Sequence, residues 1–223
     1  KDKLVNYNGT TITYDAIGNP LSYRNGMSFT WKNGRQLASF SQGSTTVYYN
    51  YNADGLRVSK SLGNKKYYYD GSTLIREESD TYSIWYFYDE SGIIGFELDS
   101  TDNTLDGTYY FVKNLQGDVI CITNANGSAV VNYTYDSWGK LISTTGSLAS
   151  TVGVINPIRY RGYYYDTETG FYSLQSRYYD AEIGRFINAD TTDVLLDNED
   201  DSLLKYNLFA YCYNNPVNMD DQT

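Results

Sequence analysis

The chain has 223 residues, a formal net charge of −10, and a composition in which 41% of the residues are hydrophobic and 17% are aromatic. A negative surface repels a phosphate backbone, so we expect no nucleic-acid partner, and the lack of a long apolar run excludes a transmembrane helix in this sequence. Among the aromatic residues 26 are Tyr and only 8 are Phe. Because Tyr favours strands and its hydroxyl tolerates water, this bias predicts sheets with one packed face and one polar face.

The chain contains no histidine. Its absence excludes Ser-His-Asp triads, Cys-His dyads and zinc sites with His ligands. The two cysteines, Cys121 and Cys212, lack the spacing of metal ligands. We therefore expect neither a bound metal ion nor a cofactor.

From the N-terminus onward one short motif recurs: an aromatic residue, then Asp or Asn, then Gly after about two further residues. It occurs at 14–18, 51–55, 88–92 and 135–139, and shorter turns of the same kind lie at 32–35, 69–71, 115–118 and 124–127. Asp and Asn bond their own backbone in turns, and Gly adopts the positive φ that a tight reversal needs. The flanking residues alternate as strands do, so each motif predicts the corner of a β-hairpin.

A single hairpin cannot bury its apolar face, so neighbouring hairpins must join edge to edge. The repeat therefore predicts an all-β fold in which consecutive antiparallel hairpins form a curved or spiralling sheet. We assign residues 1–157 to this strip of sheet.

The sequence changes character over 159–190. Two turns of the form Tyr-Asp-x-Glu-x-Gly begin at Tyr165 and Tyr179, a Gly-Arg-Phe segment follows at 184–186, and Tyr206–Tyr211 leads to Asn-Asn-Pro-Val-Asn at 214–218. This pattern resembles the RHS-repeat-associated core domain, which ends the YD-repeat shell of RHS proteins and related polymorphic toxins. We therefore assign residues 158–223 to a C-terminal core or plug segment.

The resemblance implies a bacterial shell protein that encloses and delivers a C-terminal toxin or other cargo domain of the same polypeptide. Its partners would be that cargo and the remainder of the YD-repeat shell. The family is secreted or displayed at the cell surface, and the same location is implied here. A different interpretation also stays open, in which the Tyr-rich repeats form a cell-surface module that binds carbohydrate or protein.

The resemblance also suggests one enzymatic alternative, a single self-cleavage at the end of the core. Relatives carry two Asp-Pro-x-Gly motifs, and the matching positions here begin at Asp190 and Asp221. Two carboxylates that share a proton can act as acid and base, and Arg185 would position them or polarise a carbonyl. The chain departs from the family pattern because Thr191 and Gln222 replace the prolines. The same residues are also interpretable as turn aspartates and a surface arginine.

The acidic segment 193–201 contains carboxylates of the kind that bind calcium. It lacks the glycine and the final glutamate of an EF-hand loop in register. A solvated insertion loop is the favoured interpretation.

Overall fold

The computed structural model describes residues 2–190 and 207–219. Its largest element is a sheet of 14 strands in which each strand pairs with its neighbours in sequence, from β3 to β16. We call this sheet the strip. Its strands are β3 (Thr13–Tyr14), β4 (Pro20–Ser22), β5 (Ser28–Lys32), β6 (Gln36–Gln42), β7 (Thr45–Tyr51), β8 (Arg57–Lys60), β9 (Lys65–Asp70), β10 (Thr73–Glu78), β11 (Tyr82–Asp89), β12 (Gly92–Ser100), β13 (Gly107–Lys113), β14 (Val119–Asn124), β15 (Ala129–Tyr135) and β16 (Leu141–Thr145).

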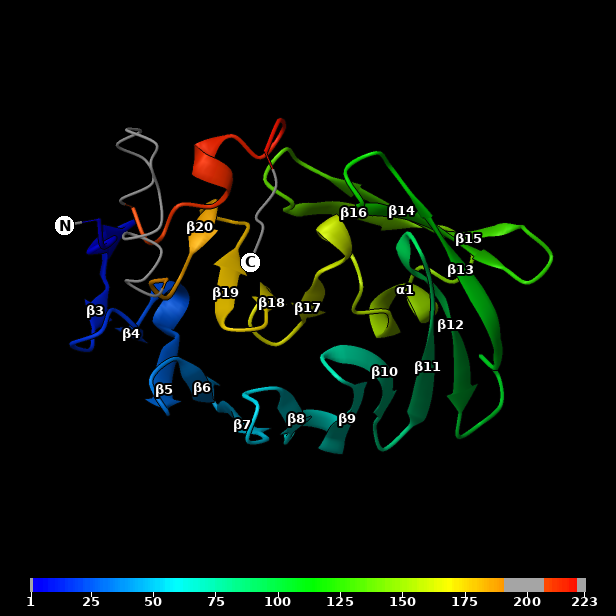
Figure 1. Cartoon of the computed structure of the whole chain (residues 1–223), viewed down its shortest axis with the longest axis horizontal. Coiled ribbons are helices and arrows are strands. Elements are labelled where there is room, and N and C mark those ends of the chain that lie inside the picture. The colour runs from blue at the N-terminus through cyan, green and yellow to red at the C-terminus, as the bar shows by residue number, and fades with distance from the viewer. Residues whose placement is uncertain (1, 191–206, 220–223) are drawn as a thin grey trace.

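The strip curves into an open arc that runs from β3 at one end to β16 at the other (Figure 1). The hairpin of β1 (Asn6–Tyr7) and β2 (Thr10–Thr11) precedes it. All pairings along the strip are antiparallel, as a chain of successive hairpins requires. The prediction of an all-β fold built from consecutive hairpins is thus confirmed.

A second sheet of four strands lies inside the arc (Figure 1). We call it the core sheet, and it consists of β17 (Tyr164–Asp166), β18 (Phe171–Leu174), β19 (Arg177–Asp180) and β20 (Arg185–Phe186). Its residues Phe171 and Tyr178 pack in one apolar cluster with Phe29 and Phe40 of the strip. The apolar face of β3–β8 is therefore covered by the C-terminal part of the same chain.

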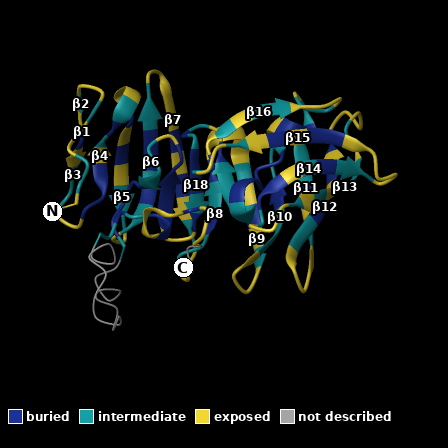
Figure 2. Cartoon of the chain, turned by 90° about the horizontal axis from the view of Figure 1, so that it is seen from above, coloured by how far each residue is buried: buried dark blue, intermediate teal, exposed yellow. Residues whose placement is uncertain are grey.

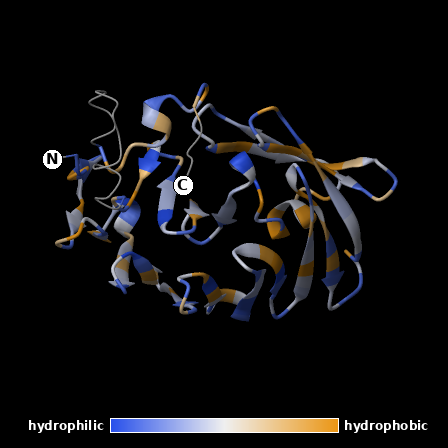
Figure 3. Cartoon of the chain, viewed as in Figure 1, coloured by the Kyte–Doolittle hydropathy of each residue, from blue (hydrophilic) through white to orange (hydrophobic). Residues whose placement is uncertain are grey.

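The other half of the strip is covered by the connection between the two sheets. This connection contains α1 (Val152–Ile155), a single helical turn that the sequence analysis did not predict. Val152 is fully buried in the cluster formed by β11–β15, and α1 is hydrophobic along its length (Figure 3). A four-residue helix is too short to show a periodic pattern, so packing alone explains it. Among the described residues, no helix has the length and apolar character needed to cross a membrane.

The strands alternate between the inside and the outside of the arc. On β11, for example, Ile84 and Tyr86 are buried, whereas Trp85 between them is exposed. Figure 2 shows the same alternation, with exposed residues concentrated in the hairpin tips. The period of two follows from the pleat of a strand.

Three of the four copies of the recurrent motif form the same turn, whereas at 88–92 Asp89 accepts the N–H and the hydroxyl of Ser91 in a tighter turn. In the turn at Asp136, the side-chain Oδ1 accepts the N–H groups of Trp138 (2.8 Å) and Lys140 (3.0 Å), and Gly139 has φ +84°. The same pair of bonds is made by Asp15, Asn52, Asn114 and Asn124. Asp and Asn are therefore interchangeable here, because only the shared side-chain oxygen is used.

Three of the tyrosines that precede strip turns donate their hydroxyls to a main-chain carbonyl of the preceding strand. Tyr51 donates to the carbonyl of Leu37 (3.0 Å), Tyr88 to that of Leu74 (2.6 Å), and Tyr135 to that of Val119 (2.9 Å). Phe has no such donor, which gives a physical reason for the excess of Tyr in the composition.

Candidate functional site: the charged seam between strip and core sheet

The two Tyr-Asp turns of the core sheet are one residue longer than those of the strip. Glycine follows the Asp after three residues in the strip but after four in the core sheet, at Gly170 and Gly184. The N–H groups of Gly170 and Gly184 donate to the carbonyls of Asp166 and Asp180, both at 2.8 Å. The carboxylates of both aspartates reach cations outside their turns, and Oδ1 of Asp180 in addition accepts the N–H of Glu182 in its own turn at 3.0 Å.

Asp166 binds two cations of the strip. Its carboxylate accepts both terminal nitrogens of Arg57 from β8, at 2.6 and 3.0 Å, and the ammonium of Lys60 at 3.1 Å. Asp166 is completely buried, and Arg57 and Lys60 are nearly so. Burial alone raises the pKa of a carboxyl group, but Arg57 and Lys60 outweigh this effect and hold the pKa of Asp166 below its usual value.

Glu168, in the same core turn, extends the contact. Both of its oxygens accept from Lys60 (3.0 and 2.8 Å), and Oε1 also accepts from the hydroxyl of Tyr49 (2.9 Å). The guanidinium of Arg57 faces the rings of Tyr67 and Tyr164, each with its centroid 5.1 Å away. Ion pairs and aromatic contacts therefore hold Arg57 from several sides.

The second core turn repeats the arrangement at another point of the arc. Asp180 accepts Nε and Nη2 of Arg24 at 2.7 and 3.0 Å. Here burial prevails over the attraction of Arg24 and raises the pKa of Asp180. A further link joins β17 to β10, where the hydroxyl of Tyr164 donates to Glu77 at 2.7 Å and Lys65 pairs with the same carboxylate at 2.7 Å.

We call these contacts the seam. The strip contributes the cations Arg24, Arg57 and Lys60, and the core sheet contributes the anions Asp166, Glu168 and Asp180. Each carboxylate of the seam is bound by a cation, so the geometry suits attachment of the core sheet to the strip rather than acid–base chemistry.

Comparison with known proteins agrees with this architecture. The sequence model of the family described as Teneurin YD-shell matches residues 98–217. The chain belongs to this family. The match includes the strip from the end of β12 onward, the core sheet and the segment that follows it.

Curated bacterial relatives align along nearly the whole chain. The tRNA nuclease WapA of Bacillus subtilis is 33% identical over 225 residues, which cover 97% of this chain and 9% of the relative. The double-stranded DNA deaminase toxin A of Burkholderia cenocepacia is 22% identical and is matched over 85% of this chain and 16% of its own length. The chain thus spans only a small part of these relatives, of which one is named as a tRNA nuclease and the other as a DNA deaminase toxin.

Solved YD-shell structures show the same fold. The crystal structure of TcdB2-TccC3-Cdc42 superposes with a TM-score of 0.75 at 21% identity, over 93% of this chain and 10% of that one. The crystal structure of TcdB2-TccC3 without its hypervariable C-terminal region superposes with a TM-score of 0.67 at 19% identity, over the same shares. The strip and core sheet therefore form a section of a YD-shell.

Within this YD-shell section, the predicted cleavage residues lie in different surroundings. Asp190 forms an ion pair with Arg177 at 2.8 Å. Arg185 instead donates to the carbonyl of Asp2 (2.7 Å) and faces the ring of Phe209. Asp221 and the acidic segment 193–201 lie outside the described residues, so the catalytic pair stays a prediction.

Sequence reasoning missed the residues of the seam. It treated Asp166 and Asp180 as ordinary turn residues and singled out neither Arg24 nor Arg57. The extra residue between Asp and Gly in the core turns was the available signal. This signal has a meaning only once the structure shows that, in the shorter strip turns, the side-chain oxygen accepts hydrogen bonds from the backbone of its own turn.

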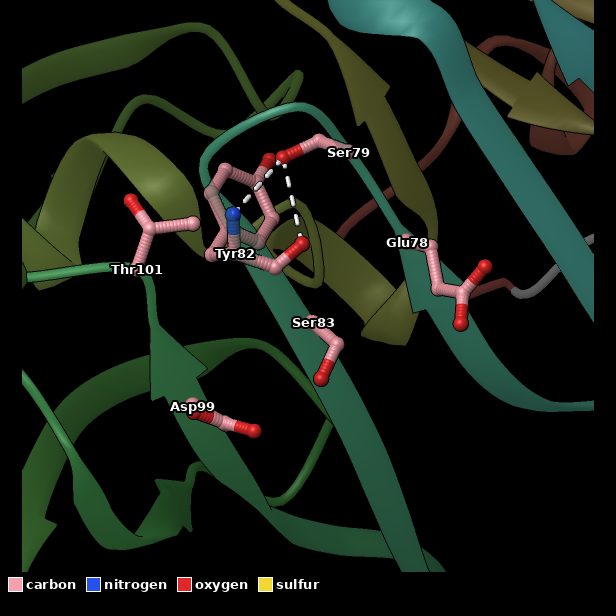
Figure 4. Close-up of a pocket in the computed structure, with 6 residues that line it drawn as sticks. All are labelled: Glu78, Ser79, Tyr82, Ser83, Asp99 and Thr101. Carbon is pink, nitrogen blue, oxygen red and sulfur yellow. Dashed lines mark hydrogen bonds between the residues drawn. The ribbon is translucent and has the colours of Figure 1, made fainter. Parts of the chain in front are cut away.

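Two of the hollows in the described part of the chain bear on its function. One of about 160 Å³ adjoins the seam and is lined by Arg57, Tyr67, Tyr164 and others, but none of the described residues that line it is a carboxylate. The other, of about 250 Å³, lies on the outside of the arc and brings Glu78, Ser83 and Asp99 together (Figure 4). Its remaining lining residues are Ser79, Tyr82 and Thr101.

Proposed function

We propose that this chain is a structural section of a shell that encloses and delivers a C-terminal cargo domain of the same polypeptide. The observation that carries the proposal is the seam, because buried ion pairs attach the core sheet to the inside of the curved strip. Such an arrangement serves a container that must stay closed around its content. We place the parent protein outside the cell or at its surface, and we divide the chain into a strip (1–157) and a core segment (158–223).

Protease protection of the full-length natural polypeptide tests this function. We expect the region downstream of the core segment to resist digestion in the native protein and to become accessible when Arg57→Met breaks the seam. Asp136→Asn, which keeps the turn oxygen of a strip hairpin, is the matched control and should leave protection unchanged. Rapid digestion of the downstream region in the native protein would refute the encapsulation.

A second candidate function is a single self-cleavage that frees the cargo. Asp190 favours it, because this carboxylate stands at the position that the resemblance assigns to catalysis and its ion pair with Arg177 at 2.8 Å fixes its place. Mass spectrometry of the full-length polypeptide should then show a cut near Asp221 that is lost in Asp190→Asn. A cut that persists in Asp190→Asn would remove this residue from the mechanism.

The outer hollow supports the third interpretation, binding of a carbohydrate at the cell surface. Two carboxylates and four residues with hydroxyls line the hollow, and the exposed Trp85 lies on the same face of the sheet. Sugars bind where aromatic faces stand beside polar groups that accept their hydroxyls. A glycan array should give binding signals that Trp85→Ala and Asp99→Ala abolish. An array without signals would contradict carbohydrate binding and would not affect the proposed shell function.

A further inference from the structure

The last described segment, residues 215–219, leaves the core region and lies against a hairpin turn of the strip. Nε2 of Gln116 donates to the carbonyl of Val217 at 2.6 Å. Nη2 of Arg161 donates to the carbonyls of Pro216 and of Met219, the latter at 3.1 Å. Figure 1 shows the segment in red beyond β20. Three backbone carbonyls within four residues are therefore bound by two side chains.

Arg161 also has contacts outside the segment. Its backbone N–H donates to Oδ1 of Asp118 at 3.0 Å, and the other oxygen of Asp118 accepts from Asn114 at 2.6 Å. Its backbone φ is +55°, and its side chain is only 9% exposed. A donor fixed in this way loses little freedom when it binds, which strengthens the contact.

The chain that enters the segment is strained. Cys212, Tyr213 and Asn214 have φ values of 48°, 50° and 60°, so three successive residues other than glycine are left-handed. Such residues relax unless both sides hold them. On one side Tyr211 is fully buried, with its ring centroid 4.0 Å from that of Tyr179, and on the other side lie the bonds from Arg161 and Gln116.

The contact recognises backbone rather than side chains. Its three bonds end on carbonyl oxygens. The side chains of Val217 and Met219 are exposed, at 54% and 47%. The interaction therefore fixes a path for the polypeptide and does not depend on the side chains of Val217 and Met219, although Pro216 between them and the core is buried.

We propose that Arg161 and Gln116 form a backbone clamp, which fixes the point where the polypeptide leaves the shell wall and continues to the cargo domain. Asp118 is the group that positions Arg161. In the sequence, Met219 is followed directly by Asp220 and Asp221. One consequence, which rests on the proposed self-cleavage, is that the clamp also presents the cleavage segment at a constant place. Arg161 and Gln116 are then positioning residues for that reaction.

Hydrogen exchange measured by mass spectrometry on the 223-residue chain tests the clamp. In Arg161→Asn we expect the amides of 215–219 to exchange about tenfold faster, as the loss of hydrogen bonds to a charged group implies. Asn tolerates the left-handed conformation, so this variant removes the guanidinium without adding backbone strain. Peptides from β9–β12 serve as the internal reference and should not change.

Two further variants keep the test decisive. Gln116→Ala lies in an exposed turn and should accelerate amide exchange at 215–219 by a smaller factor. This variant tests the clamp even if Arg161→Asn loosens the whole sheet. Met219→Ala should have no effect, because only the carbonyl of Met219 is bound. Unchanged exchange at 215–219 in both Arg161→Asn and Gln116→Ala would overturn the clamp.

A second readout separates the clamp from the reaction. In the full-length polypeptide we expect Asp190→Asn to abolish self-cleavage, whereas Arg161→Asn should slow it and scatter the cut over several neighbouring bonds. A native protein that never cuts would refute self-cleavage and leave the exchange result standing. A cut that stays single and fast in Arg161→Asn would refute the positioning role.

Discussion

The strip and the core sheet use the same Tyr-Asp pair for opposite purposes. In the strip, Asp136 bonds only its own turn, at the N–H groups of Trp138 and Lys140. In the core sheet, one additional residue before the glycine allows Asp166 to bind Arg57, which is distant in sequence. With one more residue before the glycine, the aspartate reaches a distant cation, as Asp166 and Asp180 both do, although Asp180 keeps one bond to its own turn.

The largest expected effect is the difference between two identical substitutions, Asp166→Asn and Asp136→Asn. The first leaves Arg57 buried without its anion, while Lys60 keeps Glu168, and it should lower the free energy of unfolding by about 3–5 kcal/mol. The second keeps the side-chain oxygen and should change it by less than about 0.5 kcal/mol, because Asn already fills this place in other turns of the strip. Chemical denaturation of both variants measures the difference, and equal costs would contradict the distinction between the two turns.

Lowering the pH should also remove the negative charge of Asp166. The pKa of Asp166 is lowered in the folded chain, so its contribution to stability is complete above the ordinary value of 3.8 and is lost as the pH falls below it. Asp180 has the opposite sign, because its raised pKa favours the protonated form in the folded chain. Denaturation midpoints measured between neutral pH and pH 3 should fall less steeply in Asp166→Asn than in the native chain.

Two glycines of identical turns sharpen the comparison further. A Cβ at Gly139 would overlap the ring of Tyr160 from the core region, whereas at Gly127 it would meet nothing within 4 Å. Both have positive φ, so each Gly→Ala change costs about 1–2 kcal/mol in backbone strain, and Gly139→Ala adds about 1–3 kcal/mol of overpacking. Thermal unfolding should give a clearly lower midpoint for Gly139→Ala than for Gly127→Ala. The reverse order would contradict the contact between Gly139 and the ring of Tyr160.

The smallest expected effect belongs to the strip turn itself. Asp136→Ala removes the acceptor for two backbone N–H groups at an exposed corner, where water replaces it in part. We expect a loss of about 1 kcal/mol in the free energy of unfolding. A cost as large as that of Asp166→Asn would show that the strip turns also carry long-range contacts.

Much of the strip was predictable from single residues. The alternation before Tyr51 and Tyr135 and the positive φ required at Gly55 and Gly139 are local properties, and a turn of fixed length then dictates which strands pair. The sites were less accessible to prediction. Asp190 was singled out, but its pairing with Arg177 was not, and Arg57 gave no signal because 109 residues separate it from Asp166.

By itself, the sequence determined the hairpins, their order and the all-β class, because these depend on turn chemistry and on a period of two along each strand. Only the tertiary structure decided that the core sheet lies inside the arc, which cations meet which carboxylates, and where residues 215–219 are held. Those features arise from curvature accumulated over many strands. No short stretch of sequence contains that curvature.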